Sequence, residues 1–316
     1  MNLNKLKKLS GDASFRSFYR KKNYKKSSII VYCKKQKQKN LVVYDAINNL
    51  LIKKKISAPK LINKNYNKNY IEIEDFGNLT VFELLRKKKI NKLFYYKKVL
   101  LTLNKIQKIK IKKIKTFLKT EYRIPNYSKE KLIREANLFL KWYFPNFIKD
   151  KNNFKKKKIS NIFKDLSNRL IYKKKVFIHR DFHVSNIMKT NKGLALIDNQ
   201  DAVFGNIAYD LASLIDDVRL KTNKRLKEKI FDEYIKINKS LDKYKFKNDF
   251  EILSVLRNFK VIGIFSRLSK RDGKHKYLKL IPHAWQLIEN RINCNKNFRD
   301  LKIILDKNFP KNIRKK

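Results

Sequence analysis

The sequence predicts an α+β fold, in which a small lobe that contains strands precedes a larger lobe made mainly of helices. Two β-branched, apolar runs at 29–32 and 70–73 have the length and composition of strands, and a helical pattern at 41–52 lies between them. Later in the chain, apolar residues recur three and four positions apart, which is the spacing of one helix face. We therefore expect an N-terminal lobe at 1–76 and a helical C-terminal lobe at 77–316, together forming one unit.

Capping and periodicity place the elements of the larger lobe. Thr80 and Glu83 have the spacing of a capping box, so a helix is expected to begin there. Two strand-like runs at 176–178 and 194–197 interrupt the helical pattern and enclose the densest polar cluster of the chain. Helical spacing is found at 99–109, 132–144, 230–237 and 253–268.

The most prominent feature of the composition is a formal net charge of +53, from 80 Lys and Arg residues against 27 Asp and Glu. Such a charge is typical of nucleic-acid-binding proteins, which release counterions when they contact phosphates. Here the basic residues are spread over the whole chain, without an RGG-like or zinc-finger pattern, as expected for solvated faces. We therefore expect no dedicated nucleic-acid partner despite the charge.

Other bulk features indicate a folded, cytoplasmic protein. The chain is 42% hydrophobic and 12% aromatic, which is enough to build a core. No charged start precedes a short apolar run, and no stretch of 18 apolar residues occurs, so we expect neither a signal peptide nor a membrane partner. Cys33 and Cys294 lack the spacing of metal or redox pairs, and we assign them no chemistry.

The segment HRDFHVSNIM carries the strongest chemical signal. It places Asp181 and Asn186 five residues apart, the spacing of a phosphotransferase catalytic loop. Phosphoryl transfer needs a carboxylate to take the proton of the attacking hydroxyl and an amide oxygen that can ligate magnesium. Asp198, at the end of the strand-like run twelve residues later, can supply a second metal ligand. The pattern predicts Asp181 as the base and Asn186 and Asp198 as magnesium ligands.

The charge distribution supports a cation site in the same region. No Lys or Arg occurs at 193–218, although acidic residues are frequent there. Nearby ammonium groups would compete with magnesium, so their absence fits a metal site, whereas a buried apolar stretch is the alternative explanation. We assign structural roles to His179, which would orient the loop, and to Asp210, at an expected helix start. Asp216 and Asp217 are expected at the surface.

A short polar turn near the start, Gly11-Asp12-Ala13-Ser14-Phe15-Arg16, provides backbone amides and a hydroxyl that could cover nucleotide phosphates. As a single motif it is a weak signal.

Together these segments resemble the aminoglycoside phosphotransferase and choline kinase superfamily, whose members have a protein-kinase-like fold of two lobes. A narrower resemblance is to the anomeric kinases of N-acetylmuramate and N-acetylglucosamine in cell-wall recycling. Five segments carry it in matching order: GDASFRSFYR, EDFGNLTVFELL, HRDFHVSNIM, LIDNQDAVFGNIAYDLASLIDD and RLSKRDGKHKYLKLIPHAW.

The resemblance implies ATP and Mg²⁺ as cofactors and an amino sugar as the small-molecule substrate. By this resemblance Asp181 is the base that acts on the anomeric hydroxyl, and Asn186 and Asp198 bind magnesium. The remaining roles that it implies are phosphate cover by Ser14 with Ala13 and Arg16, adenine contact by Glu74 and Phe76 in the segment 74–77, and sugar contact by Gln200 and Asp201.

Three positions depart from the pattern. The strand-like run 29–32 lacks a Lys that could pair the α- and β-phosphates, and Lys34 and Lys35 lie just beyond it. No Glu occurs in the helical pattern 41–52 to answer such a lysine. Asn199 stands where the sugar kinases more often have an aromatic residue. The phosphate contacts of the small lobe therefore stay open.

Two alternatives remain open at this point. The chain could phosphorylate another small alcohol, such as choline, a fructosamine or an aminoglycoside, because the catalytic residues are shared and only the acceptor pocket differs. It could also be a non-catalytic kinase-like fold that binds nucleic acid through its basic surface. The few acidic residues and basic surface favour an acceptor with a carboxylate over a cationic one.

Overall fold

The computed structural model divides into two compact units, each built from two segments of the chain. Unit 1 comprises Met1–Pro125 and Val176–Phe204, and unit 2 comprises Asn126–Lys175 and Gly205–Lys316. The predicted lobe boundary at residue 76 stays a prediction, since these units are defined by compactness alone. The residues that the structure describes are 6–9, 16–22, 27–87, 89–147 and 153–315.

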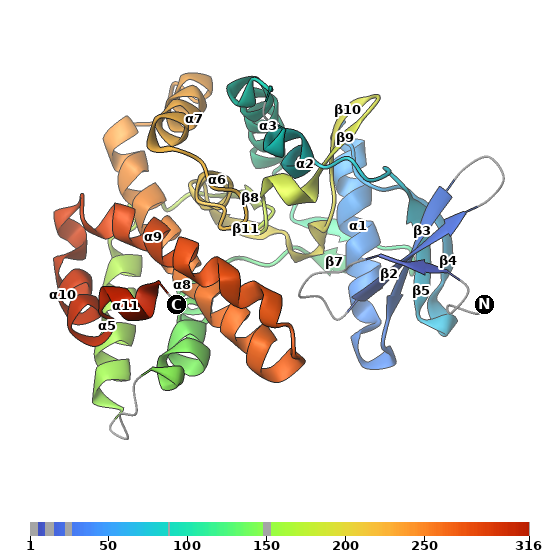
Figure 1. Cartoon of the computed structure of the whole chain (residues 1–316). Helices are drawn as coiled ribbons and strands as arrows, with labels where there is room; N and C mark the ends of the chain where they lie inside the picture. Colours follow the sequence, from blue (N-terminus) through green and yellow to red (C-terminus); the bar gives the residue numbers. More distant parts are fainter. Residues whose placement is uncertain (1–5, 10–15, 23–26, 88, 148–152, 316) are drawn as a thin grey trace. The chain divides into compact units, whose positions relative to one another are not determined.

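An antiparallel sheet with the strand order β1-β2-β3-β5-β4 forms one part of unit 1. Figure 1 shows it in blue and cyan, with helix α1 running along one face. The expected strands at 29–32 and 70–73 are confirmed as β3 and β5. The bounds are β1 Lys7–Lys8, β2 Arg16–Lys22, β3 Ser27–Cys33, β4 Leu61–Asn65 and β5 Tyr70–Glu74.

Alternation along the central strand explains why α1 packs on this sheet. Val31 and Cys33, two residues apart on β3, are fully buried in one apolar cluster with Leu41 and Tyr44 of α1 (Lys39–Lys53). Residues two apart share a face of a strand, so this face is covered by the helix. The helix predicted at 41–52 is thereby confirmed.

The rest of unit 1 contains the helices and short strands that carry the polar cluster. Thr80 accepts a hydrogen bond from the Glu83 amide at 3.1 Å, which confirms the predicted helix start. Strands β9 and β10 form a hairpin, and β8 pairs with β11. The bounds are α2 Val81–Arg86, α3 Lys92–Gln107, β6 Lys113–Lys115, β7 Glu121–Arg123, β8 Lys175–Ile178, β9 Ile187–Thr190, β10 Gly193–Leu196 and β11 Val203–Asn206.

Unit 2 is helical in its described residues. The expected helices at 230–237 and 253–268 are confirmed within α7 and α8, but the expected helix at 132–144 is divided into α4 and a π-helix, Phe139–Tyr143. The helices are α4 Lys129–Ala136, α5 Phe154–Asn168, α6 Tyr209–Ile215, α7 Lys224–Ile237, α8 Lys243–Asp272, α9 Ile281–Ile292, α10 Arg299–Asn308 and α11 Lys311–Arg314.

Helix α8, which is 30 residues long, is the central element of unit 2. Gly263 on this helix permits a close approach to the π-helix segment, because a Cβ at this position would lie 2.3 Å from the carbonyl carbon of Leu138. Aromatic rings fill the space beside it: Phe139 lies 4.9 Å from Phe259 and 5.6 Å from Trp285 between ring centroids. The core of this unit is thus built on backbone contact and aromatic packing.

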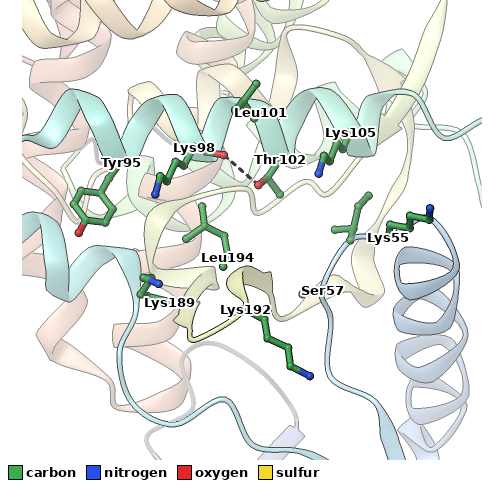
Figure 2. Close-up of a pocket in the computed structure, with 12 residues that line it drawn as sticks. Lys55, Ser57, Tyr95, Lys98, Leu101, Thr102, Lys105, Lys189, Lys192 and Leu194 are labelled. Carbon is green, nitrogen blue, oxygen red and sulfur yellow. Dashed lines mark hydrogen bonds between the residues drawn. The ribbon is translucent and has the colours of Figure 1, made fainter.

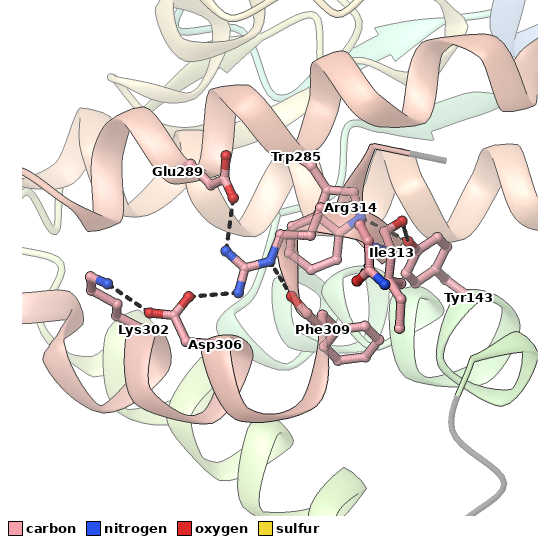
Figure 3. Close-up of polar contacts among 9 residues, drawn as sticks. Tyr143, Trp285, Glu289, Lys302, Asp306, Phe309, Ile313 and Arg314 are labelled. Carbon is pink, nitrogen blue, oxygen red and sulfur yellow. Dashed lines mark hydrogen bonds and ion pairs between the residues drawn. The ribbon is translucent and has the colours of Figure 1, made fainter.

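The C-terminal helices of unit 2 are joined by Arg314, as Figure 3 shows. Its guanidinium donates to Glu289 at 2.8 Å and to Asp306 at 2.7 Å, and it lies over the Trp285 ring at 5.3 Å. Only 5% of the Arg314 side chain is exposed. A buried arginine with two carboxylate partners fixes α11 against α9 and α10.

The expectation that Asp216 and Asp217 lie at the surface is wrong, because only 1% and 2% of their surfaces are exposed. Asp216 is paired with Lys227 at 2.7 Å and with Arg291 at 2.8 Å. Buried carboxylates require such partners, and the sequence around Asp216 gives no sign of them since Arg291 is 75 residues away.

No helix within the described residues combines the length and the apolar character needed to cross a membrane.

Candidate active site

The loop between β8 and β9 holds the predicted base and the first predicted metal ligand in a tight turn. The Asp181 carbonyl accepts hydrogen bonds at 3.0 Å from the His183 amide and from Nδ2 of Asn186. Nδ2 of Asn186 also lies 3.3 Å from Nε2 of His183. With the amide nitrogen held inside the turn, the amide oxygen of Asn186 faces away from it.

His179 joins this loop to the segment that carries the second predicted ligand. Its Nε2 lies 3.1 Å from the Ile197 carbonyl and 2.9 Å from Oδ1 of Asn199. The side chain is buried, with 1% exposed. These contacts on both sides of Asp198 are what the predicted bracing role of His179 requires, and the role itself stays a prediction.

Asp198 follows β10 in a left-handed backbone conformation, with φ at +62°. Aspartate tolerates this region better than most residues, and such conformations are common at functional sites. Arg180, beside the predicted base, also has a positive φ of 73°. Two turns of unusual geometry therefore flank the polar cluster.

The charge around Asp198 is incompletely balanced. Burial raises the pKa of its carboxyl, the Arg16 guanidinium works against this, and Asp181 and Asp201 raise it further. Arg16 donates to Oδ1 of Asp198 at 3.0 Å. Arg180 lies 3.8 Å from Asp201, so two guanidinium groups stand beside the three carboxylates. Neighbouring carboxylates that raise the pKa of Asp198 favour the binding of a further cation.

The residues present fit a magnesium ion. In the part of the chain that the structure describes, neither Oδ1 of Asn186 nor Oδ2 of Asp198 has a hydrogen-bond partner. One neutral amide oxygen and one carboxylate oxygen are ligands of the kind that magnesium takes when substrate phosphates and water supply the rest. About a third of the Asp198 side chain, 34%, is exposed, which leaves it accessible to a ligand.

Helix α1 contacts the site through a hydrogen bond between Asn48, on the helix, and Asn199, next to Asp198. Nδ2 of Asn199 donates to Oδ1 of Asn48 at 2.8 Å and to the Leu196 carbonyl at 3.0 Å. Both asparagines are fully buried. Asn199 had been noted only as a departure from the sugar-kinase pattern, and the polar Asn48 on the buried face of α1 was the signal that could have suggested its partner.

Arg16 is the small-lobe cation that the structure brings to the site. Its side chain, 3% exposed, lies over the ring of Tyr44 at 5.6 Å from the centroid and reaches Asp198. Neither Lys34 nor Lys35 forms an ion pair in the described residues. The residue opposite Arg16 on β3 is Cys33, so the arginine comes from the strand beside the one where a lysine was sought.

The predicted adenine-contacting segment is organised by Asp75, which the sequence analysis did not single out. Burial alone would raise the pKa of Asp75, but hydrogen bonds from Arg20, Ser27 and the Gly77 amide lower it below its usual value. The Arg20 guanidinium donates to both carboxylate oxygens, at 2.6 and 2.9 Å. Glu74 and Phe76, the predicted contacts, flank it and are half-buried.

The remaining predicted residues are distributed as follows. Gln200 is buried next to Asp201, to which its amide donates at 3.0 Å, while its Oε1 has no partner among the described residues. Asp210 is fully buried in the first turn of α6, in unit 2. Ala13 and Ser14 lie outside the described residues.

Comparison with known proteins identifies the type of enzyme. Residues 126–245 match the model of the phosphotransferase enzyme family. A relative from Neisseria meningitidis serogroup B, named N-acetylmuramate/N-acetylglucosamine kinase, is 28% identical over 86% of this chain and 81% of its own.

Solved structures share the fold at low identity. An ethanolamine kinase from Plasmodium vivax matches with a TM-score of 0.62 and 12% identity over 93% of this chain and 83% of its own. An aminoglycoside phosphotransferase in complex with GDP and kanamycin matches with a TM-score of 0.61 and 12% identity over 93% and 95%. The chain therefore has the protein-kinase-like fold of these enzymes, resembles the phosphotransferase enzyme family over residues 126–245, and is a phosphotransferase that acts on an alcohol group.

Proposed function

We propose that the chain is an ATP- and Mg²⁺-dependent kinase that phosphorylates the anomeric hydroxyl of N-acetylmuramate or N-acetylglucosamine. The observation that carries the proposal is the arrangement of Asp181, Asn186 and Asp198 on two loops joined by His179. The name of the Neisseria relative, which covers most of the chain, supports the substrate class. A kinase that draws on ATP and a recycled sugar would work in the cytoplasm.

The chemistry assigned to the chain's own residues is a proton transfer and the positioning of phosphates. Asp181 accepts the proton of the sugar hydroxyl while the hydroxyl oxygen bonds to the γ-phosphorus of ATP. The bond between the γ-phosphorus and the bridging β-phosphate oxygen breaks, which releases ADP. Asn186 and Asp198 would hold Mg²⁺, which neutralises phosphate charge when bound. His179 and Asn199 keep the two loops at a fixed separation.

Nucleotide contacts are assigned to the small lobe. Arg16 would contact the phosphates in place of a β3 lysine, since it is the buried cation beside Asp198. Ser14 and Ala13 would cover the phosphates through the hydroxyl and backbone amides, and Glu74 and Phe76 would contact adenine. In this reading 1–76 is the nucleotide-binding lobe and 77–316 carries the catalytic loop and acceptor site.

The acceptor side is assigned to Gln200 and Asp201. The buried, unpaired Oε1 of Gln200 can accept a hydrogen bond from a sugar hydroxyl or from the acetamido N–H. Burial of an acceptor without a partner costs free energy unless a ligand supplies a donor. Asp210 would brace the neighbouring segment from the first turn of α6.

The test is a substrate panel. Purified protein would be given ATP and Mg²⁺ with N-acetylmuramate, N-acetylglucosamine, choline or kanamycin, following ADP release and the product by phosphorus NMR. The proposal expects an anomeric phosphate on an amino sugar. Turnover of choline or kanamycin alone would keep the phosphotransferase and overturn the substrate, and this is the second candidate because the solved structures with this fold include such kinases.

The same assay tests the base. We expect Asp181→Asn to lower kcat about 10²- to 10⁴-fold while ATP affinity changes little, because general base catalysis contributes about that factor. Asp165→Asn, at an exposed aspartate of α5, is the matched control and should keep its rate. A wild-type rate in Asp181→Asn would remove Asp181 from the mechanism.

A further inference from the structure

Unit 1 contains a pocket that none of the predicted site residues lines. It has a volume of about 330 Å³ and lies between α3, the segment after α1 and the β9–β10 hairpin. Figure 2 shows Lys98, Thr102 and Lys105 along α3, with Lys189, Lys192 and Leu194 of the hairpin on the other side. The remaining lining residues are Lys55, Ile56, Ser57, Tyr95, Leu101 and Gly193.

The charge of this pocket is of one sign. Five of its twelve lining residues are lysines, and none is Asp or Glu. In the described part of the chain none of the five forms an ion pair; Lys189 instead donates to the Thr190 carbonyl at 2.8 Å, and Lys98 lies 4.3 Å from the centre of the Phe94 ring. The pocket therefore gathers ammonium groups that no protein carboxylate neutralises.

Concavity distinguishes these lysines from the many others of the chain. On a convex surface the field of neighbouring ammonium groups spreads into water, whereas the low-dielectric walls of a pocket concentrate the field of the charges that line it. Helical spacing contributes, because Lys98, Thr102 and Lys105 lie three and four residues apart and so share one face of α3. The sequence pattern alone places three of the lining residues together.

We propose that this pocket binds a small phosphorylated molecule that carries at least two phosphoryl groups. A volume of about 330 Å³ lies at the lower end of the range for small-molecule sites. Lysine binds phosphate as a point charge, and the hydroxyls of Ser57 and Tyr95 can donate to phosphate oxygens. The apolar Leu101 and Leu194 would contact the remainder of the molecule.

The position of the pocket couples it to the candidate active site through the backbone. Its hairpin begins directly after Asn186 and ends two residues before Asp198, the two predicted metal ligands. Ser57 in the pocket wall accepts a hydrogen bond from the Leu196 amide at 2.8 Å, and the Lys189 amide donates to the Leu79 carbonyl at 2.8 Å. A ligand that bridges α3 and the hairpin would restrain the hairpin, and amide exchange at 187–196 should slow.

Tripolyphosphate is the probe for the binding test. It would be titrated calorimetrically into the full chain in metal-free buffer near 0.15 M KCl, with excess ADP to occupy the nucleotide site. The triple variant Lys98→Gln, Lys105→Gln and Lys192→Gln should bind about tenfold more weakly than wild type, since each lost contact of an exposed charge weakens binding roughly twofold. Only exposed lysines are changed, so folding should be kept and is checked by circular dichroism.

A second triple variant removes the same charge elsewhere in unit 1, at the exposed residues Lys35, Lys68 and Lys110. Unchanged tripolyphosphate binding in this control, with loss in the pocket variant, supports the site. Equal loss in both variants would show a response to net charge, and absence of binding to wild type would also overturn the proposal. Tighter, pocket-dependent binding of an RNA oligonucleotide would replace it by a nucleic-acid site. Because this titration measures binding and no turnover, a failure of the pocket proposal can be distinguished from a failure of the proposed function.

Discussion

Asp198 and Asp216 lie in the same stretch without Lys or Arg, yet their electrostatic surroundings are opposite. Asp198 has one guanidinium partner, and burial with neighbouring carboxylates raises its pKa. Burial alone would raise the pKa of Asp216 too, but Arg291 and Lys227 lower it to about 2. Asp198 thus has one cation in contact and two carboxylates nearby, whereas Asp216 has two cations in contact.

This is the difference that we expect between a predicted metal ligand and a carboxylate that only stabilises the fold. A carboxylate that serves only to hold elements together is stabilised by matched partners, as Asp216 is by two cations and the Ser254 hydroxyl at 2.6 Å. A carboxylate that awaits a cation carries an unfavourable field until the cation arrives. The stretch without Lys or Arg contains both aspartates and does not distinguish them, because the cations that pair with Asp216, Lys227 and Arg291, lie 11 and 75 residues further along the chain.

The largest effect is expected at Asp198. Asp198→Asn should lower kcat with ATP, Mg²⁺ and the amino sugar by about 10²- to 10⁴-fold, because it replaces a predicted metal ligand and leaves Asn186 alone. Thermal stability should change little, because loss of the Arg16 ion pair is offset by relief of the buried charge and of its repulsion with Asp181 and Asp201. A loss of stability as large as that expected for Asp216→Asn would indicate that Asp198 mainly stabilises the fold.

Asp216→Asn should have the reverse profile. Asp216 is buried, and its two partly buried cations would lose their carboxylate. We therefore expect the free energy of unfolding to fall by about 3 kcal/mol while turnover per folded molecule is unchanged. Urea denaturation monitored by circular dichroism gives the first quantity, and an active-site-normalised rate gives the second. Wild-type stability in Asp216→Asn would contradict the stabilising role assigned to Asp216.

The contribution of the Asp216 carboxylate to the free energy of unfolding also depends on pH. Its pKa of about 2 in the folded state lies below the unfolded value, so its contribution is present above about pH 4 and is lost as the pH falls through about 2.

Asp45 on α1 extends the comparison, because it is buried and forms no ion pair with any residue that the structure describes. Burial raises its pKa to about 6, only partly offset by Lys64, and Asn49 donates to it at 2.9 Å. A raised carboxyl pKa means that stability increases as the pH falls from about 7 toward 4. At pH 7.5, Asp45→Asn should therefore raise the free energy of unfolding, by at most about 3 kcal/mol, and should flatten its pH dependence between 4 and 7.

The smallest effect concerns Arg16. In the nucleotide-free protein Arg16→Met should strengthen Mg²⁺ binding by up to about tenfold, because a competing cation leaves Asp198, and should weaken ATP binding by a similar factor. Calorimetric titration of each ligand measures both, and Arg16→Lys should restore part of the ATP affinity. A parallel loss of both affinities would instead indicate a collapsed site.

Local patterns in the sequence were sufficient for the elements with clear periodicity and for the spacing of the catalytic loop. Thr80 was recognised as a helix cap because its partner is three residues away. The segment expected as one helix at 132–144 is helical but changes from α4 to a π-helix at Phe139–Tyr143, beside the close approach of Gly263 from far along the chain. The π-helix there has no local signature.

By itself, the sequence determined the fold class, the type of enzyme and the choice of Asp181, Asn186 and Asp198 as candidates, because these depend on residue types at short, fixed separations. Only the tertiary structure decided which polar groups meet: Arg16 with Asp198, Arg291 with Asp216, and Asn199 with Asn48. These partners are separated by 182, 75 and 151 residues. Electrostatic and hydrogen-bond energies depend on distance in space, so their effect on function appears only once the chain has folded.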